Sequence, residues 1–216
     1  TGALMAIARY VLKTLDGIDR PAIAGQMPNI KGGATTMLDL GANVDSTPEH
    51  LLQFGVMCSE LVRSVEGKPR PTVCLLNIGA EDIKGNEVVR RAGELLRASG
   101  LNFYGNIEGD DIYKGTTDVV VCDGFVGNVL LKAAEGLADM LMKTVSAEIL
   151  GVLNTEKSLA TQAFHSLAKR FEYHEIGGAP LLGVQGISII CHGASNARSI
   201  QNALRFATTL KARGLN

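Results

Sequence analysis

The chain has 216 residues and a formal net charge of −1 at pH 7, with 46% hydrophobic and 20% charged residues. This composition is typical of a globular protein with one sizeable core, and it excludes an intrinsically disordered chain. There is no basic run and no tryptophan, so we expect no nucleic acid as a partner. No apolar run reaches the roughly 18 residues that a membrane-spanning helix needs.

The cysteines indicate a reducing compartment. Cys58, Cys74, Cys122 and Cys191 are scattered, and none of them forms a Cys-x-x-Cys pair. Three of them lie in apolar, strand-like runs, which favours buried thiols over disulfides or a zinc site. We therefore expect a cytoplasmic protein without a bound metal.

Hydrophobic periodicity and turn residues predict helices that alternate with strands. Helices are expected at residues 2–15, 48–65, 87–98, 126–150 and 194–213. Extended segments are expected at residues 22–27, 35–40, 72–77, 101–104, 118–122 and 187–191. This alternation favours a mainly parallel sheet with helices on both faces, a three-layer α/β/α sandwich that we expect to form a single domain over residues 1–216.

Four polar loops that contain glycine follow predicted strands. In sheets of this kind the ligand lies beyond the carboxyl ends of the strands. The loops are residues 39–43, 77–84, 123–128 and 192–196. We expect them to converge on one edge of the sheet and to form the functional site there.

The third of these loops carries the strongest local signal. Asp123, Gly124, Gly127 and Asn128 stand between a buried strand and a helix, where unpaired N–H groups and the helix dipole suit a phosphate or an oxyanion. The two glycines allow a ligand to approach the backbone closely. The alternative is an ordinary strand-to-helix turn in which Asp123 caps the helix, and the segment alone does not separate the two.

Other polar residues of these loops are candidates for chemistry, each with a structural alternative. Lys84 can neutralise a phosphate or an oxyanion, or it is a solvated surface lysine. Asn43 is a ligand contact or part of an Asx turn, and His192 is a general base or a hydrogen-bonded structural histidine. A covalent thioester on Cys122 is the weakest of these ideas, because a buried thiol is inert unless its pKa is lowered.

Residues 154–173 differ from their surroundings. Leu159, Phe164 and Phe171 fall on one face of a predicted helix, which Lys157 and Lys169 supplement with positive charge. Such a helix contacts a membrane surface or a partner, or it packs on its own domain or on a dimer mate. We expect a protruding helical segment at about residues 150–175.

Several motifs together resemble those of phosphate acyltransferases, a bacterial phospholipid-synthesis family. These motifs are Thr1-Gly-Ala-Leu-Met5, Gly17-Ile-Asp-Arg-Pro-Ala22, Leu38-Asp-Leu-Gly-Ala-Asn-Val-Asp45, Leu75-Leu-Asn-Ile-Gly79, Lys84-Gly-Asn86, Val121-Cys-Asp-Gly-Phe-Val-Gly-Asn128 and Cys191-His-Gly-Ala-Ser-Asn196. The resemblance covers essentially the whole chain. It implies transfer of an acyl group from acyl carrier protein to inorganic phosphate, without metal or cofactor. It also implies a fold similar to isocitrate and isopropylmalate dehydrogenases and phosphotransacetylases, and a homodimer.

The resemblance also suggests roles for individual residues. Lys84 is expected to neutralise phosphate or the oxyanion, and Asn128 to hydrogen-bond the reacting carbonyl or the phosphate. The amides of residues 124–127 would complete the anion site, with Asp123, Asn43 and His192 as orienting groups. Thr1 and Gly2 are expected to belong to the phosphate site. Because family members carry about a hundred further residues before Thr1, we expect that the chain is the later part of a longer protein.

Three other functions remain open at the level of the sequence. A phosphotransacetylase-like enzyme would use acyl-CoA as the donor. A nicotinamide-dependent decarboxylating dehydrogenase would need metal-binding carboxylates and a cofactor loop, for which the sequence offers no clear candidates. A non-catalytic scaffold would recruit the next enzyme of lipid synthesis, a glycerol-3-phosphate acyltransferase, to the membrane.

Overall fold

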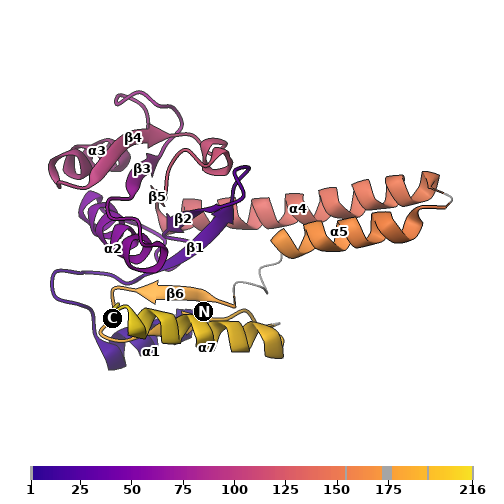
Figure 1. The fold of residues 1–216 in the computed structure, drawn as a ribbon. Coiled ribbons are helices and arrows are strands. Elements are labelled where there is room, and N and C mark those ends of the chain that lie inside the picture. Colours follow the sequence, from indigo (N-terminus) through magenta and orange to yellow (C-terminus); the bar gives the residue numbers. More distant parts are fainter. Residues whose placement is uncertain (1, 154, 172–176, 194, 216) are drawn as a thin grey trace.

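The computed structural model describes residues 2–153, 155–171, 177–193 and 195–215 (Figure 1). Its helices are α1 (Gly2–Leu12), α2 (Pro48–Glu66), α3 (Glu87–Ala98), the 3-10 helix η1 (Asp111–Lys114), α4 (Gly124–Val152), α5 (Lys157–Phe171) and α7 (Ala197–Ala212). Its strands are β1 (Ala22–Pro28), β2 (Ala34–Leu38), β3 (Thr72–Leu76), β4 (Asn102–Ile107), β5 (Val119–Val121), β6 (Ala179–Leu182) and β7 (Ser188–Ile190). The fold is therefore of the mixed α/β class.

The strands form one seven-stranded sheet in the order β4-β3-β5-β2-β1-β6-β7. Strands β4, β3, β5 and β2 are parallel to one another, as expected from the alternation of helices and strands. Strand β1 pairs antiparallel with both β2 and β6, and β6 pairs antiparallel with β7. The mainly parallel arrangement thus describes the β4-to-β2 part, whereas the other part of the sheet runs antiparallel.

The reversal has its origin in a hairpin between β1 and β2. Residues 29–33 connect the two strands, and Asn29 Oδ1 accepts hydrogen bonds from the backbone N–H groups of Lys31 at 3.1 Å and Gly33 at 3.2 Å. A connection of this length joins antiparallel strands, because a parallel crossover needs a dozen or more residues. Strands β6 and β1 are joined more weakly, by the residue pairs Ala22–Leu182 and Ile23–Leu181.

Helices cover both faces of the sheet. Successive side chains of a strand point to opposite faces, so Val73 and Leu75 of β3 pack against α2 and α3, whereas Cys74 belongs to the core of the other face. The first core also contains Leu210 of α7. The second contains Ala8 of α1, and side chains from the first turns of α4 pack against it. Fully buried Val, Leu and Met side chains in β2, β3 and β5 hold these layers together.

Helices α4 and α5 contact each other and extend away from the sheet as a long hairpin (Figure 1). The protrusion includes α5 and begins within α4. Large apolar side chains are exposed along it, namely Leu137, Met140, Leu141, Val145, Ile149 and Val152 of α4 and Leu159 and Leu167 of α5. The ends of the expected segment at residues 154 and 172–173 lie outside the described residues. Among the described helices, none is long and apolar enough to cross a membrane.

Candidate functional site

The carboxylate of Asp39, at the end of β2, organises the loop that follows this strand. Its Oδ1 accepts hydrogen bonds from the N–H groups of Ile23 at 3.0 Å, Gly41 at 3.2 Å and Ala42 at 2.9 Å. Its Oδ2 accepts from the backbone N–H and the side-chain Nδ2 of Asn43, at 2.8 and 2.9 Å. Burial raises the pKa of this carboxyl, while these hydrogen bonds act in the opposite direction. Asp39 therefore fixes residues 39–43 in one conformation.

The Asn43 side chain forms hydrogen bonds within the protein and stabilises this loop. It is buried, and Nδ2 donates to Pro21 O at 3.0 Å as well as to Asp39 Oδ2. The structural alternative for Asn43, a local turn built on Asp and Asn side chains, is thus what the structure contains. Sequence reasoning overlooked Asp39. The signal for it was an Asp at a strand end, followed by glycine and Asn43, in which a short acceptor can take several loop amides.

Gly124 and Gly127 bring the start of α4 against this same loop. A Cβ atom on Gly124 would collide with Asn43 O and Asp39 Oδ2, and one on Gly127 would collide with Asp39 O. Both glycines are buried. The close approach that the sequence predicted is therefore an approach of two protein segments, residues 39–43 and the first turn of α4.

Asp123 caps α4, as one of the two sequence readings predicted. Its Oδ1 accepts hydrogen bonds from Phe125 N at 2.8 Å and Val126 N at 3.4 Å, and Gly127 N donates to Asp123 O at 2.8 Å. The expected anion cradle of the amides of residues 124–127 is corrected here, because three of these four amides already donate to Asp123. The cap satisfies donors that a bound anion would otherwise use.

Asn128 lies on the exposed side of the first turns of α4, next to the loop after β2. Gly41 has a φ of +116°, and a Cβ atom on it would lie 3.2 Å from Asn128 Oδ1. The glycine therefore leaves room for the Asn128 side chain. This amide offers both a donor and an acceptor at the carboxyl end of β5.

Lys84 lies at the same edge, in the loop that follows β3. Asn77 shapes this loop, since its Nδ2 donates to Lys84 O at 3.1 Å and its Oδ1 accepts from Ile78 N at 2.8 Å. Strand β3 lies next to β5, and β5 lies next to β2, so the three loops end at neighbouring positions. The Lys84 side chain is exposed at this edge.

Among the remaining predicted residues, His192 does not join this group. His192 follows β7, which runs opposite to β2 because three antiparallel pairings separate them, so its loop lies at the other edge of the sheet. The expected convergence of four loops is thus corrected to three. Gly2 is exposed at the start of α1. Thr1 lies outside the described residues.

Cys122 is not placed for covalent chemistry. Cys122 is 3% exposed, its Sγ donates to Asp39 O at 3.3 Å, and burial raises the pKa of its thiol far above the usual range. A thiol in this state is a poor nucleophile, which rules out the thioester idea for Cys122. Within the described part of the chain, no group of three or more His, Cys, Asp or Glu side chains could hold a metal ion.

Comparison with known proteins places the chain in a family. A family model described as fatty acid synthesis protein matches residues 1–216. Phosphate acyltransferases from Polaromonas sp. and Delftia acidovorans are 56% and 57% identical to it over 213 residues, which is 96% of this chain and 57% and 62% of those proteins. The chain thus spans about three fifths of the length of these curated relatives.

The fold is also found in a solved phosphotransacetylase from Streptococcus pyogenes. The two structures agree with a TM-score of 0.60 at 17% sequence identity, over 98% of this chain and 60% of that one. At this identity the likeness concerns the fold alone, and it agrees with the phosphotransacetylase-like fold that the motifs implied. The match over the whole chain establishes that the protein belongs to the family described as fatty acid synthesis protein, in agreement with the phosphate acyltransferase motifs in its sequence.

Proposed function

We propose that the protein transfers a fatty acyl group from acyl-[acyl carrier protein] to inorganic phosphate, giving acyl phosphate for bacterial phospholipid synthesis. The observation that carries this proposal is the edge of the sheet where the loops after β2, β5 and β3 meet, with Asn128 and Lys84 exposed on it. The names of the relatives from Polaromonas sp. and Delftia acidovorans support the same reaction class.

The reaction makes two demands on the protein. Phosphate has to be held in line with the thioester carbonyl, and the tetrahedral oxyanion that forms has to be stabilised. The Lys84 ammonium group supplies positive charge for the phosphate or for the oxyanion. The Asn128 amide donates to the carbonyl oxygen as negative charge develops on it, and neither step needs a metal or an organic cofactor.

The buried residues behind these two groups act by positioning. Asp39 and Asn43 fix the loop that lies against Asn128, and Asp123 fixes the first turn of α4. Phosphate would then lie in front of this turn and not on its capped amides. In this proposal His192 acts elsewhere in the complete enzyme, because its loop follows β7 at the other edge of the sheet.

The decisive experiment is a release assay with a purified chain of verified mass. Acyl-[acyl carrier protein] is incubated with and without phosphate, and free carrier protein is measured. Phosphate-dependent release supports the proposal. Offering acyl-CoA in a parallel reaction separates it from the phosphotransacetylase-like alternative, which the shared fold with the Streptococcus pyogenes enzyme favours.

The α4–α5 hairpin is the proposed contact surface for partners. Its exposed apolar side chains, such as Leu141, Ile149 and Leu159, suit a dimer mate or the surface of a membrane. We infer that the protein is a cytoplasmic homodimer with peripheral membrane contact through this hairpin. A hairpin that recruits a glycerol-3-phosphate acyltransferase without catalysis by this chain is the alternative, and the release assay separates the two.

A further inference from the structure

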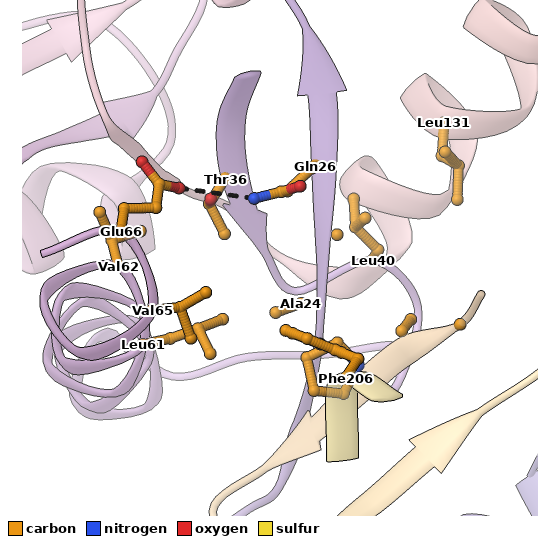
Figure 2. A pocket seen from close by; sticks show the side chains of 14 residues that line it. Ala24, Gln26, Thr36, Leu40, Leu61, Val62, Val65, Glu66, Leu131 and Phe206 are labelled. Carbon is orange, nitrogen blue, oxygen red and sulfur yellow. Dashed lines mark hydrogen bonds between the residues drawn. The ribbon is translucent and has the colours of Figure 1, made fainter. Parts of the chain in front are cut away.

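A cavity of about 380 Å³ lies between α2, β1 and α7 (Figure 2). Its wall is formed largely by apolar side chains, including Leu61, Val62 and Val65 of α2, Ala24 of β1 and Phe206 of α7. Pockets that bind small molecules have volumes of roughly 300–1,000 Å³ and apolar walls of this kind. The cavity is thus large enough for a ligand. A charged ligand would lose its hydration against this apolar wall, so an apolar ligand is favoured.

The cavity is connected with the candidate site through two leucines. Leu40 lies between Asp39 and Gly41 in the loop after β2, and it lines the cavity. Leu131 also lines it and stands one helical turn after Asn128 on α4. One end of the cavity is therefore lined by the chain neighbour of Asp39 and by a residue one helical turn from Asn128.

The other end of the cavity is polar. Gln26 Nε2 donates to Glu66 Oε1 at 3.4 Å across it, as Figure 2 shows. Thr36, which is 2% exposed, also lines the cavity, and its Oγ1 has no hydrogen-bond partner among the described residues. A buried hydroxyl without a partner is unfavourable, and in an otherwise apolar wall it separates a polar occupant, which would bind it, from a hydrocarbon, which would not.

We propose that this cavity holds the hydrocarbon chain of the acyl donor, with the acyl carbonyl at the Asn128 edge and the chain running toward Gln26 and Glu66. This assignment rests on the proposed acyl transfer. A hydrocarbon chain needs no hydrogen bond from Leu61, Val62 or Phe206. Each methylene that leaves water increases the binding constant severalfold. The Gln26–Glu66 hydrogen bond marks the far end, where both side chains are exposed to solvent.

The test uses cis-parinaric acid, an 18-carbon polyene fatty acid whose fluorescence rises in apolar surroundings. We expect saturable binding of one molecule per chain. Val65→Phe places a larger side chain at the wall of the cavity and should weaken binding on the order of tenfold, because several methylenes lose their place. The matched control is Val56→Phe on the same helix, at an exposed position away from the cavity, which should leave binding unchanged.

A second variant keeps the test decisive if Val65→Phe disturbs folding. Thr36→Val keeps the shape of the side chain and removes the unpartnered hydroxyl. A hydrocarbon occupant then binds equally well or more tightly. Weaker binding by Thr36→Val would mean that the hydroxyl contacts a polar ligand, and equal binding by wild type and Val65→Phe would mean that the acid binds elsewhere; either result overturns the assignment.

The acyl-chain assignment and the proposed reaction can fail separately. Parinaric acid binding that Val65→Phe weakens, in a protein that releases no carrier protein, would leave the acyl-chain site standing and refute the reaction. Phosphate-dependent release with equal rates for short and long acyl donors, in both wild type and Val65→Phe, would refute the site alone.

Discussion

Asn43 is bound twice by the same oxygen of Asp39, which accepts from its backbone N–H at 2.8 Å and from its side-chain Nδ2 at 2.9 Å. These two hydrogen bonds hold the loop in one conformation although it has glycine at position 41. The loop therefore presents a fixed surface to α4. We expect Asp39→Asn to lower the free energy of unfolding by about 3 kcal/mol, because an amide group would face donors in a buried site. Urea denaturation measures this change. Asp45→Asn, at an exposed position in the same loop, is the control and should change stability little.

The contact between α4 and the loop after β2 makes a second prediction. Gly124→Ala and Gly127→Ala should each cost roughly 2 kcal/mol of unfolding free energy or more, because the added Cβ meets backbone atoms that have no room to move. Gly136→Ala is the matched control in the same helix, since nothing lies within 4 Å of a Cβ there. It should stabilise the protein by up to about 1 kcal/mol. Thermal denaturation of the three variants would contradict this explanation if all three behaved alike.

His50 predicts a dependence of stability on pH. Its Nδ1 accepts a hydrogen bond from Thr47 N at 3.1 Å while Thr47 Oγ1 accepts from His50 N, a capping box at the start of α2. Burial and the nearby Arg20 lower the pKa of His50 below its usual value of 6.5, so the folded state favours the neutral ring. This contribution to stability is complete above pH 6.5 and is lost as the pH falls through the lowered folded-state pKa.

The measurement is the urea midpoint as a function of pH. Between pH 7.5 and pH 5 we expect a loss on the order of 1 kcal/mol from this cap. His50→Gln keeps an acceptor at the same position and does not titrate. Its stability should therefore fall less over the same interval, and an identical fall in both proteins would show that other groups are responsible.

The proposed chemistry predicts large effects at the exposed edge. In the complete enzyme, Lys84→Ala and Asn128→Ala should each lower kcat by about 10²–10³, because each removes one group that stabilises charge in the transition state. Lys31→Ala is the control, since this exposed lysine lies in the hairpin between β1 and β2, away from the loops of the site. Steady-state release of carrier protein measures all three. Full activity of both site variants would exclude these roles.

The hairpin predicts an effect on association. Leu159, which is 67% exposed on α5, should contribute to contact with lipid vesicles, so Leu159→Glu together with Phe164→Glu should reduce co-sedimentation severalfold. The control is Tyr104→Glu, at an exposed apolar position on β4 outside the hairpin. Sedimentation of the hairpin variant at the wild-type level would argue against membrane contact.

The parts of the site that could be predicted from the sequence are those that depend on short-range pattern. The apolar run of β3, the polar loop after it and Asp123 before α4 all carry local signals, and the structure contains the strand, the loop and the cap. The direction of β7 could not be predicted this way. It depends on the pairing of β6, a four-residue strand that the periodicity did not show, and so His192 was placed at the wrong edge.

The role of Asp39 was equally hard to predict. Its partners include Ile23, which is 16 positions away along the chain, and the glycines that pack beside it belong to α4. A pattern of residue types does not show that a carboxylate will be bound by amides from two segments and covered by the glycines of a third. The sequence therefore predicted a ligand where the structure has a protein segment, at Gly124 and Gly127.

The short ladder between β1 and β6 has a consequence for motion. Two residue pairs connect the parallel part of the sheet with β6 and β7, whereas β1 and β2 are paired over five. Local opening costs least where the fewest backbone hydrogen bonds break, so this seam is expected to open before either part unfolds. Gly25 of β1 and Pro180 of β6 flank the cavity just beyond the seam. Backbone amides of β6 should accordingly exchange with deuterium sooner than those of β3, and opening of the seam would widen the cavity that Gly25 and Pro180 flank.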